Sequence, residues 1–181
     1  AGPAEQMNRR DLLRVTLAAG GGLSLMGHSP YRQWYVFRAT HLIVVTPEEV
    51  PDARATAERV AAALAAGLPD SRAMAATART SVDVVKLLRS HQLPLALLPG
   101  AEAVAAVGGT GRFLEEGPVP LRTLAVFGRD LLVVLDDFPL GKARQIVKAL
   151  AELRPSAPDS PIPFHAGALA PADRVVAPAA R

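Results

Sequence analysis

Cysteine is absent from the 181 residues of the chain. This absence excludes disulfide bonds, thiolate metal sites and cysteine nucleophiles, and it fits either a reducing compartment or an exported protein without disulfides. The sequence also lacks any run of five basic residues, and its formal net charge is only +3, so binding to nucleic acid is not expected. Half of the residues are hydrophobic, and the length fits one domain with a core.

Aromatic residues are scarce, and half of them stand close together. The chain has one Trp, two Tyr and five Phe, and four of these eight follow one another within a short distance: Tyr31, Trp34, Tyr35 and Phe37. Amphipathic rings of this kind lie at the headgroup level of membranes, which predicts an interfacial segment at residues 28–36 that continues to Phe37. The alternative is that the same rings cover one end of the hydrophobic core.

A weakly apolar stretch, residues 7–27, precedes the aromatic segment. It begins with N-R-R-D-L-L-R, in which Arg9 and Arg10 are adjacent, and it continues with an apolar centre that contains three glycines. The motif resembles the twin-arginine export signal, S/T-R-R-x-F-L-K. The resemblance implies export of a folded protein across the bacterial inner membrane, with residues 1–6 as an upstream extension. Because the cleavage site is poor, the sequence leaves two alternatives open: a signal kept as an anchor and a signal that is removed. The alternative is an amphipathic first helix.

Residues 37–154 alternate short apolar runs with helical patterns, which predicts an α/β fold with a mixed sheet flanked by helices. Residues 155–181 contain six prolines and are expected to form an extended or disordered arm rich in Pro and Ala. The glycine-rich loop 108–120 follows a helix and lacks a Lys-Ser/Thr pair, so it is not a phosphate-binding loop. Strands are expected at 37–46, 71–79, 93–100, 121–127 and 130–139, and helices at 51–66, 82–91, 101–107 and 141–153.

Three stretches carry a resemblance to a known family: TSVDVVKLLRSHQLPLALLPGAEA (80–103), PLRTLAVFGRDLLVVLDDFP (120–139) and IPFHAGAL (162–169). They resemble the TAXI family, the solute receptors of TRAP transporters, and more broadly the periplasmic binding proteins. The resemblance implies a single receptor lobe, because the second lobe that this family inserts is missing. It also implies that Thr46, Thr80 and Ser81 would face a carboxylate solute. An ordinary helix N-cap explains Thr80 and Ser81 equally well.

The remaining polar residues fit no catalytic or metal site. Asp136 and Asp137 are adjacent, which favours a turn over a cation site. Glu48 and Glu49 are expected to start the helix at 51–66, where acids interact favourably with the helix dipole. Four histidines share neither a ligand spacing nor an acid or base partner: His28, His41, His91 and His165. We therefore expect no catalysis, no metal and no cofactor.

These expectations combine into a non-enzymatic accessory or adaptor subunit of a membrane-associated complex. We expect it in the periplasm, held at the inner membrane where the signal is uncleaved, with a protein or membrane complex as its partner. The alternative function is that of a TRAP-type receptor for a small carboxylate solute. That alternative predicts a ligand at Ser81, a dimer that supplies two lobes, and a cleaved signal.

Overall fold

The computed structural model describes residues 41–153, residue 155 and residues 159–169. Outside these ranges lie the residues predicted for export and for the membrane interface: Arg9, Arg10, Tyr31, Trp34, Tyr35 and Phe37. In the described part of the chain, no helix combines the length and the apolar character that crossing a membrane requires.

Five strands form one sheet: β1 (Ile43–Pro47), β2 (Met74–Ala78), β3 (Leu95–Pro99), β4 (Leu121–Phe127) and β5 (Asp130–Leu135). Their order is β2-β1-β3-β5-β4. β1 pairs in parallel with β2 and β3, whereas β5 runs antiparallel to β3 and β4. β4 and β5 are antiparallel because only Gly128 and Arg129 connect them, and Gly128 has the positive φ of 63° that such tight turns require.

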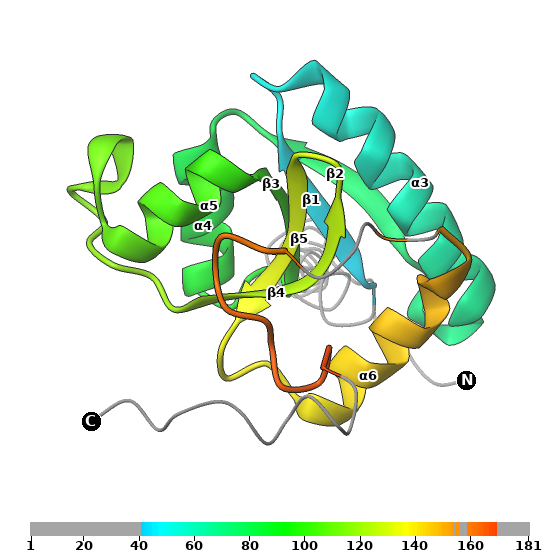
Figure 1. The fold of residues 1–181 in the computed structure, drawn as a ribbon. Coiled ribbons are helices and arrows are strands. Elements are labelled where there is room, and N and C mark those ends of the chain that lie inside the picture. Colours follow the sequence, from blue (N-terminus) through cyan, green and yellow to red (C-terminus); the bar gives the residue numbers. More distant parts are fainter. Residues whose placement is uncertain (1–40, 154, 156–158, 170–181) are drawn as a thin grey trace, which may run out of the picture. The chain divides into compact units, whose positions relative to one another are not determined.

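Four α-helices flank this sheet: α3 (Pro51–Gly67), α4 (Ser81–Arg89), α5 (Gly100–Gly108) and α6 (Leu140–Ala149). Successive strand residues point to opposite faces. Val44 and Leu97 therefore pack with α3 and α6, whereas Val45 and Leu98 pack with α4 and α5. Figure 1 shows the sheet between these two helix pairs. The predicted α/β fold, with a mixed sheet flanked by helices, is confirmed.

Several element boundaries differ from the predicted ones. The strand expected over 71–79 begins only at Met74, because Pro69–Ser71 form a 3-10 turn and Arg72 adopts a left-handed φ of 45°. The helix expected over 141–153 ends at Ala149 and is followed by a 3-10 turn at Ala151–Leu153. The apolar stripe predicted for this helix thus continues into a differently wound segment.

Residues 159–169, which we counted with the C-terminal arm, pack against the domain. The backbone N–H of Thr123 in β4 donates to the carbonyl oxygen of Pro163, and the N–H of His165 donates to that of Thr123, both at 2.9 Å. The buried ring of His165 donates from Nε2 to the carbonyl of Phe138 at 2.9 Å and accepts the N–H of Gly167 on Nδ1 at 3.0 Å. This segment therefore lies along the outer edge of β4.

Candidate functional site

The carboxyl ends of β1, β2 and β3 lie at one edge of the sheet because these strands are parallel. The chain leaves β1 towards α3 through residues 48–50 and leaves β2 towards α4 through residues 79–80. α5 begins directly after β3. Ligands of open α/β sheets bind in the crevice at this edge, so a site is expected here.

Thr80 caps the N-terminus of α4. Its backbone is extended, and its Oγ1 accepts the N–H of Asp83 at 3.2 Å. The same hydroxyl donates to the Asp83 carboxylate at 2.9 Å. These two bonds resemble a capping box, in which residues three positions apart satisfy each other. The N-cap interpretation of Thr80 is confirmed, and both roles of its hydroxyl are used within α4.

Ser81 holds a carboxylate that belongs to the chain itself. Glu49 Oε1 accepts the backbone N–H of Ser81 at 3.1 Å and its hydroxyl at 3.0 Å. The Ser81 N–H lowers the pKa of the Glu49 carboxyl below its ordinary value; the Ser81 hydroxyl and the Arg112 guanidinium act in the same direction, whereas desolvation opposes them. A helix N-terminus attracts anions through its free N–H groups and dipole. At α4 this anion is Glu49.

Arg112 also contacts this carboxylate. Its Nη1 donates to Glu49 Oε1, and its Nε lies 3.6 Å from Glu102 Oε2 in the first turn of α5. Arg112 belongs to the loop 108–120, which is fixed by the completely buried ring of Phe113. Gly109 permits the loop its path: with φ of 60°, a Cβ there would lie 2.6 Å from the nitrogen of Pro118. One arginine thus links the N-termini of α4 and α5.

Thr46 occupies a different environment from Ser81. It is completely buried on the face of the sheet that α3 covers, and its Oγ1 has no hydrogen-bond partner among the described residues. The structure thus brings Thr80 and Ser81 together at the start of α4. Thr46 and Ser81 are both completely buried, but the Ser81 hydroxyl bonds to Glu49, whereas the Thr46 hydroxyl is unpaired among the described residues.

The acids Glu48 and Glu49 do not act at the helix for which we predicted them. α3 begins at Pro51 with Val50 as an N-cap that makes no side-chain bond. The carboxylate of Glu49 reaches the N-terminus of α4 instead, since the segment after β1 lies beside the segment after β2 in a parallel pair. We predicted that Glu49 stabilises the dipole of the helix now called α3. The structure shows that Glu49 contacts the N-terminus of α4.

A buried acid stands at the start of β5, at the same edge of the sheet. Asp130 pairs with Pro99 in the ladder and is 4% exposed, and its Oδ1 has no hydrogen-bond partner in the described part of the chain. Burial raises the pKa of the Asp130 carboxyl, with Arg129 acting against this and Asp52 acting in the same direction. The guanidinium of Arg129 pairs with the carboxylate of Asp52 at 2.8 Å.

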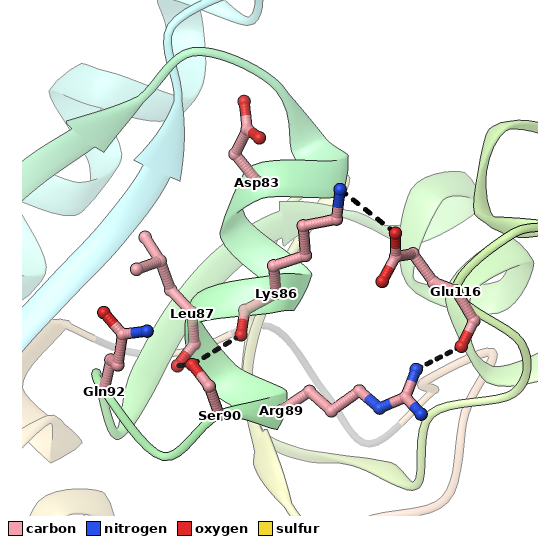
Figure 2. Close-up of a pocket in the computed structure, with 7 residues that line it drawn as sticks. All are labelled: Asp83, Lys86, Leu87, Arg89, Ser90, Gln92 and Glu116. Atoms are coloured by element: carbon pink, nitrogen blue, oxygen red, sulfur yellow. Dashed lines mark hydrogen bonds and ion pairs between the residues drawn. The ribbon is translucent and has the colours of Figure 1, made fainter.

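An open groove runs beside α4, as Figure 2 shows. It encloses about 610 Å³ and is lined by Asp83, Lys86, Leu87, Arg89, Ser90, Gln92 and Glu116. Lys86 pairs with the Glu116 carboxylate at 3.1 Å, which raises the pKa of Lys86, and Arg89 donates to the Glu116 carbonyl. Both cations are thus engaged by one loop residue. The contacts of Lys86 and Arg89 with Glu116 therefore hold the loop 108–120 against α4.

Arg112 and Glu102 are missing from the sequence prediction, as is the contact between Glu49 and Ser81. Glu49 and Ser81 are 32 positions apart, and Glu49 and Arg112 are 63 apart. The only local signal was Glu102 in a first helical turn, where an acid is favourable. The arrangement holds a carboxylate by one N–H, one hydroxyl and one guanidinium, so its chemistry is anion binding.

In the part of the chain that the structure describes, no three His, Cys, Asp or Glu side chains lie close enough together to hold a metal ion. No protein-family profile matches the chain, and no curated protein is significantly similar to it.

Proposed function

We propose that the chain is a non-enzymatic accessory or adaptor subunit that binds another protein in a membrane-associated complex of the periplasm. Its domain would correspond to a single lobe of the TAXI type, and residues 7–27 would direct its export and anchor it. One observation carries the proposal: the donors at the start of α4 hold Glu49 of the same chain. A receptor would offer these donors to its solute.

The energetics of this contact favour a fixed surface over a solute site. Hydrogen bonds to a charged group are about twice as strong as neutral ones, so a solute would have to replace well-placed bonds to Glu49. Arg112, which would be a natural solute anchor, is also engaged by Glu49 and Glu102. In addition, a lone lobe supplies only one wall of a closing cleft.

The test is gentle detergent extraction of native membranes, affinity isolation of the full chain and mass spectrometry of the proteins that accompany it. We expect a partner at fixed stoichiometry and a mature chain that keeps its arginine pair, Arg9 and Arg10. A solitary soluble chain that begins after about residue 28 would contradict both the tether and the accessory role.

The second candidate function is a receptor for a small carboxylate solute. It is favoured by the convergence of the Ser81 N–H, the Ser81 hydroxyl and Arg112 on one carboxylate oxygen, which is how a solute carboxylate would be held. In this function Glu49 would move away when the solute binds. Calorimetric titration of the full chain with a panel of small carboxylates separates the two functions, because the accessory subunit is expected to bind none of them.

A further inference from the structure

The strand β2 has an unpaired edge. Its inner side pairs with β1: the N–H of Met74 donates to the carbonyl of Leu42 at 3.1 Å, and the carbonyl of Ala78 accepts the N–H of Glu48 at 2.8 Å. In this register Met74, Ala76 and Ala78 face β1, so the N–H and C=O groups of the residues between them face outwards. Those residues are Ala75 and Thr77, and within the described chain their outward groups have no hydrogen-bond partner.

The opposite edge of the sheet is occupied at Thr123. β4 is the last strand on that side, and the segment 163–165 pairs with it through Thr123. An uncovered strand edge is a template for a further strand, which main-chain hydrogen bonds hold in place. Within the described residues β2 therefore offers this template along its length, whereas the template at β4 is interrupted at Thr123.

Two arginines determine what kind of strand fits. Arg72 and Arg79 flank the uncharged run M-A-A-T-A, both are exposed, and neither belongs to an ion pair among the described residues. If two copies paired antiparallel through β2, Arg72 of one copy would lie near Arg79 of the other, and the like charges would repel. A strand with an acidic residue at each end, about seven positions apart, would instead meet a cation at both ends in either direction.

We propose that the β2 edge binds an extended segment of a partner protein whose ends are acidic. The segment would add a sixth strand to the sheet by bonding to Ala75 and Thr77, and its acidic ends would pair with Arg72 and Arg79. After Met74, the run consists of small side chains, residues 75–78, which allow a neighbouring strand to approach without steric conflict. This inference rests on the proposed function, because it assumes a protein partner and names the surface that receives it.

The experiment measures fluorescence anisotropy of dye-labelled eight-residue peptides with the full chain. The first probe is Asp-(Thr-Val)-(Thr-Val)-(Thr-Val)-Asp, and a second probe carries Lys at both ends. The chain is compared with the double variant R72E/R79E and with R144E/K148E, which reverses two exposed charges on α6, a helix that packs mainly against α3 and β4. A third probe keeps the Asp ends and replaces the second Val by Pro. When the Asp ends meet Arg72 and Arg79, the N–H of this Val faces β2 in either strand direction, so the substitution removes a donor to the edge.

We expect the chain and R144E/K148E to bind the Asp-ended peptide, and R72E/R79E to bind it about tenfold more weakly, since exposed ion pairs are individually modest. The double variant should prefer the Lys-ended peptide, and the Pro peptide should bind the chain more weakly than the first probe. Equal binding of the Asp- and Lys-ended peptides, or an equal effect of R144E/K148E, would overturn the inference. The inference would also be overturned if none of the three probes bound to the chain.

The same variants separate this inference from the proposed function. If the native chain isolates with a stoichiometric partner and R72E/R79E does not release it, the accessory role stands and the β2 edge is not the docking surface. If no partner accompanies the native chain, the proposed function fails, whatever the peptides do.

Discussion

Replacing Glu49 by alanine tests whether this residue holds the start of α4. The substitution removes the acceptor of the Ser81 N–H and hydroxyl and a contact of Arg112, and Ser81 is completely buried. Each bond to a charged acceptor contributes about 1.5 kcal/mol or more. The Glu49 side chain is 35% exposed, so water replaces part of the loss, and we expect a net decrease of about 2 kcal/mol in the free energy of unfolding.

The assay is thermal and denaturant unfolding of the full chain near neutral pH. A loss of about 2 kcal/mol lowers Tm by roughly 8 °C in a domain of this size. Glu48→Ala is the matched control, because the exposed Glu48 contributes its backbone N–H to the fold and keeps it in the variant. That control should change the free energy of unfolding by less than about 0.5 kcal/mol. Equal effects of the two substitutions would refute the reasoning.

The pH dependence of Glu49→Ala provides a second reading of the same contact. Because the folded-state pKa of Glu49 is lowered, its stabilisation is present above the ordinary value of 4.5 and is lost as the pH falls through the lower folded value. The difference in stability between the chain and Glu49→Ala should therefore shrink on acidification below that value. A difference that grows with acidification would contradict the ionised contact with Ser81.

Three further substitutions test other parts of the domain. Asp130→Asn should raise Tm near neutral pH, because the raised folded-state pKa of Asp130 makes the chain lose stability as the pH rises through it; the gain should vanish as the pH falls towards about 4. Gly67→Ala would place a Cβ 2.7 Å from the Cβ of Ala149 and should cost about 1–3 kcal/mol of unfolding free energy, part of which Ala149→Gly should restore by removing that Cβ. His165→Ala removes both ring bonds and should speed hydrogen exchange at the amide of Thr123, whereas unchanged exchange would mean that other contacts hold the segment.

Local patterns in the sequence predict the elements of this fold well. The apolar run around Val44 and the helical spacing of Ala57, Val60 and Leu64 specify a buried strand and a one-sided helix, and both are present. The cap at Thr80 can also be predicted from the sequence, because its hydroxyl accepts the N–H of a residue only three positions later. These features depend on neighbours in the chain, which a pattern records.

The contacts that build the site depend on topology instead. Glu49 lies beside Ser81 only because β1 and β2 are parallel neighbours, and no spacing in the sequence records that pairing. Arg112 contacts Glu49 because of the path of the loop 108–120. The glycines of this loop do not predict which residues the loop contacts. The proline-rich composition of residues 155–181 predicted an extended or disordered arm. It gave no indication that residues 159–169 lie at the edge of β4, where the missing N–H of a proline costs little.

The unequal edges of the sheet limit what the domain can assemble. A sheet with two open edges can accept strands on both sides and extend without limit into a fibre. In the described residues the chain bonds its own segment 163–165 to Thr123 of β4, which interrupts that edge as a template. Strand pairing would therefore be directed to one side of the sheet. If a partner strand joins β2, as proposed above, the two sides of the sheet would have different roles, one bonded within the chain and one open to another protein.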